Sequence, residues 1–203
     1  MKEMIKHSLD LTDRYTFLST LPKTYKLGLE IGVWQGWYTM HMIKRTNMHV
    51  IGVDPWIGTE SYEDLDQSDS NFNPFEQGPD GFKWQEARYH STISFLSQNA
   101  PLNRWSIFRS YSNDLSNFIG NDSLDFVYID GEHTYDAVSN DIDVWWPKLK
   151  ENGILSGHDY NDVNPGTIKA VDEFSTKIGV KPLITGTSPE KGDADAPSWL
   201  FIK

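Results

Sequence analysis

Short runs of apolar and β-branched residues recur from residue 27 onward, and each has the length of a β-strand. The seven predicted strands are Leu27–Val33, Val50–Asp54, Trp105–Tyr111, Leu124–Asp130, Gly153–His158, Pro182–Thr185 and Ser198–Ile202. Between the fourth and fifth runs, apolar residues three or four positions apart predict a helix over Ala137–Leu149. The same spacing, less regular, predicts helices over Trp84–Leu96 and Ile168–Ile178.

Strands and helices in alternation predict an α/β fold, a Rossmann-like three-layer α/β/α sandwich with a mainly parallel sheet, because parallel neighbours need a long crossover. The last two runs are joined only by the polar segment 186–197, so they are expected to form an antiparallel hairpin. A chain of 203 residues fits one domain over 1–203.

Two segments fall outside this alternation. Residues 1–26 are mixed and polar, and we expect a helical lead-in with Phe17, Leu18 and Leu21 as its anchors. Residues 57–81 are rich in Asp, Ser, Asn, Gly and Pro and are long for a loop within a compact domain. Such a loop is either a lid over a site or a disordered segment, and the sequence leaves both open.

Composition excludes several classes of protein. There is no cysteine, so disulfides, thiolate metal sites and cysteine nucleophiles are ruled out. A formal net charge of −11 disfavours a nucleic-acid partner, since such binders carry a clustered basic face. No apolar run suits a membrane span, and residues 1–10 lack the pattern of a secretory signal. We therefore expect a cytoplasmic protein.

Polar residues close five consecutive predicted strands. They are Glu30 with Gly32, then Asp54, then Ser110, Tyr111 and Ser112, then Asp130, and finally His158 with Asp159. In an open parallel sheet, ligands bind outside the carboxyl ends of the strands. Five polar strand ends on one rim therefore predict one binding crevice.

The first strand runs into a glycine turn, Glu30-Ile-Gly-Val-Trp-Gln-Gly36, and Asp54 follows 22 residues after Gly32. This spacing is typical of a nucleoside site in which the acidic residue binds the ribose hydroxyls. Trp34 replaces the second glycine of a dinucleotide motif, and Glu30 would repel a pyrophosphate, so NAD is disfavoured. S-adenosylmethionine has no phosphate, and its cationic groups attract a carboxylate. A purely structural glycine turn is the alternative.

These blocks, with Ile129-Asp-Gly-Glu-His-Thr-Tyr135 and Gly157-His-Asp-Tyr160, resemble the class I S-adenosylmethionine-dependent methyltransferases over most of 27–203. Within that superfamily the chain is most similar to a small stand-alone branch. That branch contains macrocin-type and cephalosporin-hydroxylase-like enzymes and is related to catechol O-methyltransferases. The resemblance implies a seven-stranded sheet whose last strand is antiparallel.

The resemblance also assigns cofactor contacts. It implies that Glu30 and Gly32, in the turn that ends at Gly36, line the methionine end of S-adenosylmethionine, and that Asp54 holds the ribose. The residues expected to border the adenine are Ser110, Tyr111, Ser112 and Trp56, with Asp130 also near the cofactor. Bulky tryptophans at 34 and 37 depart from the turn of the superfamily at large.

Asp130 and Asp159 end neighbouring runs with one helix between them, so their carboxylates are expected to face each other. With the amide oxygen of Asn161 they would suit Mg²⁺ or another divalent cation. In the related catechol-type enzymes, acidic residues at similar places hold such an ion. The alternative is that these oxygens serve only as hydrogen-bond acceptors.

His133, just after Asp130, is the candidate general base, since a histidine with a pKa of about 6.5 can take the acceptor's proton near neutral pH. His158 is the second candidate, and a structural role is the alternative for either histidine. The predicted function is O-methylation of a small hydroxylated metabolite or sugar. Another metal-assisted, hydroxylase-like reaction and a non-catalytic nucleoside-binding module are alternatives, and the acceptor and the oligomeric state stay open.

Overall fold

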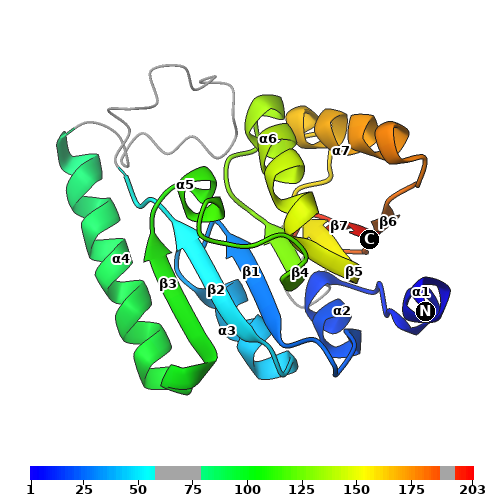
Figure 1. The fold of residues 1–203 in the computed structure, drawn as a ribbon. Helices are drawn as coiled ribbons and strands as arrows, with labels where there is room; N and C mark the ends of the chain where they lie inside the picture. The colour runs from blue at the N-terminus through cyan, green and yellow to red at the C-terminus, as the bar shows by residue number, and fades with distance from the viewer. Residues whose placement is uncertain (58–78, 188–194) are drawn as a thin grey trace.

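The computed structural model describes residues 1–57, 79–187 and 195–203, without the side chains of 79–82. Its strands are β1 Leu27–Ile31, β2 His49–Asp54, β3 Trp105–Arg109, β4 Leu124–Ile129, β5 Leu149–Gly157, β6 Leu183–Ile184 and β7 Trp199–Ile202. They form one seven-stranded sheet in the order β3-β2-β1-β4-β5-β7-β6 (Figure 1). Strands β1 to β5 pair in parallel, whereas β7 is antiparallel to both β5 and β6. The predicted fold class is confirmed.

Helices pack on both faces of this sheet. They are α1 Lys2–Ser8, α2 Arg14–Thr20, α3 Trp37–Arg45, α4 Pro79–Asn99, α5 Ser112–Ser116, α6 Tyr135–Trp145 and α7 Pro165–Ile178. One apolar layer lies between the sheet and α1 to α4, and the other lies between the sheet and α5 to α7. None of the helices in the described ranges combines the length and the apolar character that a bilayer crossing needs.

The helix predicted over 137–149 is shorter in the structure. Helix α6 ends at Trp145, a 3-10 turn covers Trp146–Lys148, and Leu149 already opens β5 opposite Leu124. Pro147 explains this end, because proline has no backbone N–H and clashes with the preceding turn of an α-helix. The apolar pattern continued to Leu149 because Leu149, although it lies in β5, is buried in the same cluster as Trp145.

The predicted hairpin is present, and β7 lies between β5 and β6 in the sheet. The proposed lid at 57–81 lies almost wholly outside the described residues. Residues 1–26 contain α1 and α2, and Phe17, Leu18 and Leu21 are buried against the sheet. Helix α2 therefore docks on this face of the sheet, with the ring of Phe17 centred 6.0 Å from that of Phe126 on β4.

A buried carboxylate ties the amino ends of the central strands together. Asp125 Oδ2 accepts hydrogen bonds from the backbone N–H groups of Lys26 and Leu27, at 2.8 and 2.9 Å. Its Oδ1 lies 2.8 Å from Lys150 Nζ. One side chain on β4 thus fixes where β1 begins and holds β5 beside it.

We expect Asp125→Ala to lower the free energy of unfolding by about 2–3 kcal/mol, because two part-buried N–H groups lose their acceptor and Lys150 loses its partner. Asp143→Ala is the control, since the carboxylate of Asp143 is exposed and pairs with Lys177 on the surface. It should change stability by less than about 0.5 kcal/mol. Urea unfolding measures both, and equal losses would contradict the role of Asp125.

The turn after β1 brings two strands into very close contact. Gly32 has a φ of 84°, and a Cβ at this position would lie 2.0 Å from the carbonyl oxygen of Asp130. Its own N–H donates to the carbonyl of Val53 at 3.0 Å. Only glycine can occupy this position without moving the end of β4.

Gly32→Ala should therefore destabilise the protein by more than about 3 kcal/mol, since backbone strain and a steric clash add. Gly179→Ala provides the matched control. Gly179 also has a positive φ, of 67°, but nothing lies within 4 Å of its added Cβ. It should lose only about 1–2 kcal/mol. Chemical denaturation compares the two, and similar losses would show that crowding at Gly32 is relieved cheaply.

Candidate functional site

The carboxyl ends of the central parallel strands gather the predicted polar residues at one edge of the sheet. Strand β1 lies between β2 and β4, and β5 follows β4, so the loops after these four strands are neighbours (Figure 1). Glu30 on β1 is close enough to Asp54 and Asp130 for their charges to affect its pKa. The single predicted rim therefore exists.

The carboxylate of Asp54 accepts hydrogen bonds from the backbone of the glycine turn and of the segment after β2. Its Oδ2 accepts the N–H of Trp34 at 2.9 Å, and its Oδ1 accepts the N–H of Trp56 at 2.8 Å. Both tryptophans have positive φ values, 48° and 41°, which are costly for large side chains. Burial raises the pKa of Asp54, while these backbone hydrogen bonds oppose the rise. The Asp54 carboxylate thus stabilises the strained backbone at both tryptophans.

The two tryptophans of the turn point outward. Trp34 is 54% exposed with the Arg88 guanidinium 5.2 Å from its ring centre, and Trp37 is 55% exposed and packs on Phe95. Gly36 lets α3 start here, since a Cβ would lie 3.0 Å from the methyl group of Thr92. The turn accommodates these bulky residues because both side chains are exposed to solvent.

Trp56, predicted to add to the adenine wall, is only 1% exposed. Its Nε1 donates to the carbonyl oxygen of Trp34 at 3.0 Å, and its ring packs edge-on against Tyr89. The structure therefore places this ring beneath the turn, where it supports the backbone.

Glu30 is buried, and its carboxyl accepts a hydrogen bond from the hydroxyl of Thr39 on α3. Burial raises the pKa of Glu30 well above its ordinary value, although the Thr39 hydrogen bond works in the opposite direction. The side chain links β1 to α3 directly under the glycine turn.

The segment predicted to border the adenine follows β3. The N–H of Ser110 donates to the carbonyl of Asp54 at 3.2 Å. Ser110 therefore lies beside the residue that the sequence predicts to bind the ribose. Tyr111 is half-exposed at the start of α5. Ser112 Oγ instead donates to Asp141 Oδ1 on α6, at 2.5 Å, and burial raises the pKa of Asp141 to about 6. Ser110 and Tyr111 are thus the rim residues, and Ser112 anchors them.

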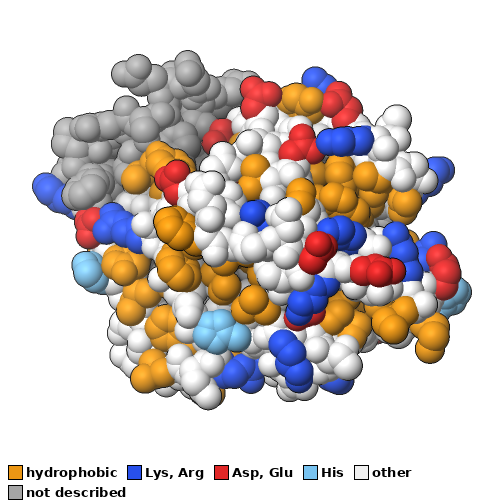
Figure 2. Space-filling model, in the orientation of Figure 1, with side chains coloured by type: hydrophobic (Ala, Val, Ile, Leu, Met, Phe, Trp, Pro, Cys, Tyr) orange, Lys and Arg blue, Asp and Glu red, His pale blue; other side chains and the backbone are white. Residues whose placement is uncertain are grey.

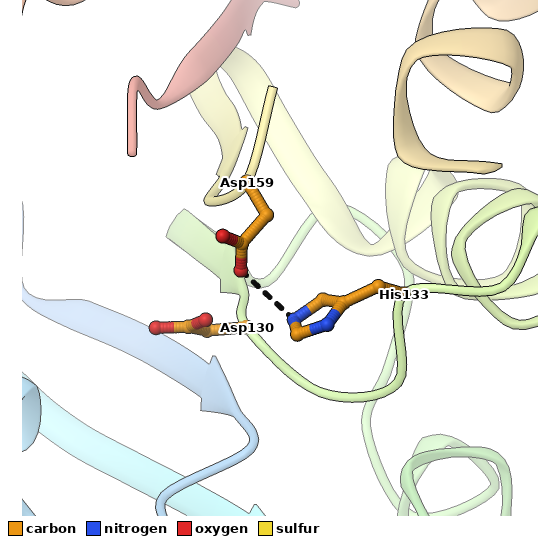
Figure 3. A group of neighbouring side chains, drawn as sticks. All are labelled: Asp130, His133 and Asp159. Carbon is orange, nitrogen blue, oxygen red and sulfur yellow. Dashed lines mark ion pairs between the residues drawn. The ribbon is translucent and has the colours of Figure 1, made fainter. Parts of the chain in front are cut away.

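Three side chains converge beside this turn. They are Asp130, His133 and Asp159, and each offers one possible metal-ligand atom (Figure 3). These three atoms lie within 4.8 Å of one another. Asp130 follows β4, His133 lies in the loop before α6, and Asp159 follows β5 with a φ of 59°. His133 Nε2 lies 2.9 Å from Asp159 Oδ2. The structure thus brings the two predicted carboxylates together with the predicted base.

Asn161, the predicted third metal ligand, has its oxygen engaged elsewhere. Its Oδ1 accepts hydrogen bonds from the backbone N–H groups of Val163 and Asn164, both at 3.1 Å, and from Asn164 Nδ2 at 3.2 Å. These bonds shape the loop before α7. His133 stands where the sequence suggested an amide oxygen.

His158 lies between acidic groups. Its Nδ1 is 3.1 Å from Asp159 Oδ2 and 3.5 Å from Asp130 Oδ1. Burial disfavours the charged imidazole, but Tyr128 and these carboxylates outweigh that effect and raise the pKa of His158 well above its ordinary value. Burial likewise works against ionised Asp159, yet the two histidines lower its pKa. The carboxylates of Asp130 and Asp159 thus lie on one side of the His158 ring, next to its Nδ1.

Two further residues reach the cluster without having been predicted. Arg14 Nη1 lies 3.3 Å from Asp130 Oδ2, and Arg14 Nη2 lies 2.9 Å from Asp195 Oδ1. Asp195 Oδ1 is also 3.4 Å from His158 Nε2. Asp195 lies in the connection 186–197 of the predicted hairpin, next to the carboxyl end of the fifth predicted strand. The sequence therefore offers a signal that could have placed Asp195 near the site. The lead-in sequence contains no comparable signal for Arg14.

The surface offers hollows elsewhere. One runs along α4 beside Phe95, and another lies on α7 beside Lys169 and Asp172. Neither contains a residue of the predicted site. On the face shown in Figure 2, basic and acidic side chains are interspersed, without a broad basic patch.

A protein-family model described as a methyltransferase domain matches residues 29–160. No curated protein sequence matches the chain. The match to the family spans β1 to the residue after Asp159 and so includes both halves of the site.

Solved structures share the fold at low identity. An O-methyltransferase from Bacillus cereus, in complex with SAH, aligns over 100% of this chain and 90% of its own, with a TM-score of 0.60 and 14% identity. The O-methyltransferase TomG from Streptomyces achromogenes, in complex with SAM, covers 89% and 74% at a TM-score of 0.59 and 11% identity. Precorrin 8w decarboxylase from Methanobacterium thermoautotrophicum covers 88% and 81% at a TM-score of 0.56 and 14% identity.

Identities this low show likeness of fold alone, and the fold hosts more than one reaction. The family match carries further, because it covers most of the chain and contains the glycine turn, Asp54 and the acidic cluster. The chain therefore belongs to the methyltransferase domain family and is a class I S-adenosylmethionine-dependent methyltransferase, as its sequence predicted.

Proposed function

We propose that the chain transfers the methyl group of S-adenosylmethionine to a hydroxyl oxygen of a small molecule. The observation that carries this proposal is the cluster of Asp130, His133 and Asp159 beside the glycine turn. A cofactor turn and a base at the same sheet edge are what such a transfer requires, because donor and acceptor must meet in line.

The glycine turn suits the cofactor. Asp54 has its carboxylate at the turn, where it binds the ribose. Ser110 and Tyr111 follow β3 beside Asp54 and contact the adenine. The carboxylates of Asp130 and Asp159 lie at this edge, and negative charge there favours a cationic sulfonium over a pyrophosphate. Bound S-adenosylmethionine supplies an electrophilic methyl group and leaves as S-adenosylhomocysteine. That the Bacillus cereus structure was solved with SAH supports the same ligand here.

His133 takes the proton of the acceptor. Asp159, held ionised by its two histidine neighbours, lies 2.9 Å from Nε2 of His133 and orients the ring. With Nε2 directed at the carboxylate, Nδ1 is the nitrogen that can accept a proton. The acceptor oxygen becomes nucleophilic as that proton leaves.

A divalent cation is the second candidate for activating the acceptor. Two carboxylates and one imidazole whose ligand atoms lie within 4.8 Å form a donor set that fits Mn²⁺ or a similar ion. Asp130, His133 and Asp159 would hold the ion, which would lower the pKa of the acceptor hydroxyl. In that case His133 is a ligand instead of the base, and chelation by EDTA abolishes turnover.

The acceptor is a small molecule with a free hydroxyl. Its class, sugar or phenolic, is to be found by screening with labelled cofactor. A hydroxylase-like reaction would consume no methyl group, and a nucleoside-binding module would bind the cofactor without turnover. Release of S-adenosylhomocysteine together with label in the acceptor separates all three.

We expect Asp54→Ala to weaken binding of S-adenosylmethionine by about tenfold or more, since charge-assisted bonds to the ribose are lost. Calorimetric titration measures this, with NAD as the competing ligand. Asp143→Ala, an exposed carboxylate far from the turn in sequence, should leave affinity unchanged. Wild-type affinity in Asp54→Ala, or preference of the native protein for NAD, would refute the assignment.

His133→Ala should retain cofactor affinity and lower kcat by about 10²–10⁴-fold, the usual contribution of a general base. Steady-state kinetics and calorimetry on the same preparation measure both. His49→Ala is the control, because its ring binds Asn103 and Ser106 near the amino end of β3. Turnover at the wild-type rate would remove His133 from the reaction.

A further inference from the structure

Arg14 and Asp195 lie outside residues 29–160, the part of the chain that matches the family model, yet both reach the candidate site. Arg14 begins α2 in the lead-in, and Asp195 precedes β7. Their side chains meet at 2.9 Å, and both are largely buried. A buried ion pair at the edge of a reaction site calls for an explanation beyond stability, because its desolvation offsets much of its attraction.

Local structure directs the guanidinium of Arg14 into the site. Asp13 caps α2, since its Oδ1 accepts the N–H groups of Tyr15 and Thr16 at 2.7 and 2.8 Å. The guanidinium carbon lies 5.0 Å from the ring centre of Tyr15 and 5.3 Å from that of Tyr38. With cap and rings fixing its path, the side chain of Arg14 has little freedom.

The charges around Arg14 make it a bridge. It contacts Asp130, which belongs to the proposed reaction cluster, and Asp195, whose side chain is 4% exposed. Asp195 in turn lies 3.4 Å from Nε2 of His158, whose other ring nitrogen faces Asp159. The contacts thus run from Arg14 through Asp195 and His158 to the carboxylate that orients His133.

We propose that Arg14 and Asp195 are positioning residues for methyl transfer. Arg14 holds the carboxylates of Asp130 and Asp195 in place, and Asp195 keeps the His158 ring turned so that Asp159 faces His133. This inference rests on the proposed function, because it assigns these residues to that reaction. Both act through the geometry of the cluster, because their contacts at the site are with Asp130, His158 and each other.

The test uses Arg14→Met, which keeps much of the apolar stem but removes the charge, and Arg14→Lys, which restores one cationic contact. Arg45→Met is the matched control. Arg45 on α3 also contacts α2, through Ser19, and within the described ranges its side-chain hydrogen bonds go to Ser19 and His41, which lie outside the site. Loosening of α2 alone would therefore affect Arg45→Met as well.

We expect Arg14→Met to lower kcat about 10²-fold, the usual effect of displacing catalytic groups by about 1 Å. Affinity for S-adenosylhomocysteine and the KM of the acceptor should change by less than about threefold, because binding contacts remain. Arg14→Lys should regain part of kcat, and Arg45→Met should match the wild type. Adding Asp195→Asn to Arg14→Met should lower kcat little further, because both changes break the same contact.

Wild-type kcat in Arg14→Met, or an equal loss in Arg45→Met, would overturn the proposal. A crystal structure of Arg14→Met, or of Arg14→Lys if the former does not fold, provides a reading independent of turnover. Movement of Asp195 and the His158 ring supports positioning, and unchanged positions refute it. If the wild type transfers no methyl group to any acceptor, the proposed function fails, whereas the crystal structure still decides whether Arg14 positions the cluster.

Discussion

The contact between Gly32 and the carbonyl of Asp130 is the constraint on which the rest of the site depends. Because glycine has no side chain, the turn after β1 can lie against the end of β4. This contact sets the glycine turn beside the cluster of Asp130, His133 and Asp159. Any side chain at Gly32 would push Asp130 away from the turn and so separate the glycine turn from the cluster of Asp130, His133 and Asp159.

A balance of charge is the second requirement of the site. Three carboxylates, Asp130, Asp159 and Asp195, approach one another at the sheet edge, where burial weakens screening by water. Arg14 and the His158 ring, whose pKa the neighbouring carboxylates raise, lie between them and offset their repulsion. His133 contacts the cluster through Asp159, whereas His158 lies close to all three carboxylates.

Much of this arrangement could be predicted from the sequence, because strand runs, a glycine turn and acidic strand ends are local signals. The sheet, the hairpin and the meeting of Asp130 with Asp159 follow from them. Side-chain direction could not be predicted. The burial of Trp56 and the internal bonds of Asn161 depend on positive φ values and loop hydrogen bonds, which carry no periodic pattern. Arg14 was missed because its partners are more than a hundred residues away.

The place of β7 has a consequence for the order of assembly. Strand β6 precedes β7 in the chain, but it joins the sheet only through β7, which lies between it and β5. During synthesis β6 must therefore wait, unpaired, until the later strand has left the ribosome. Asp195 lies just before β7 and is synthesised with it. A growing chain can therefore form the glycine turn early, whereas the contacts of Asp195 with Arg14 and His158 form only at a late, long-range step of folding.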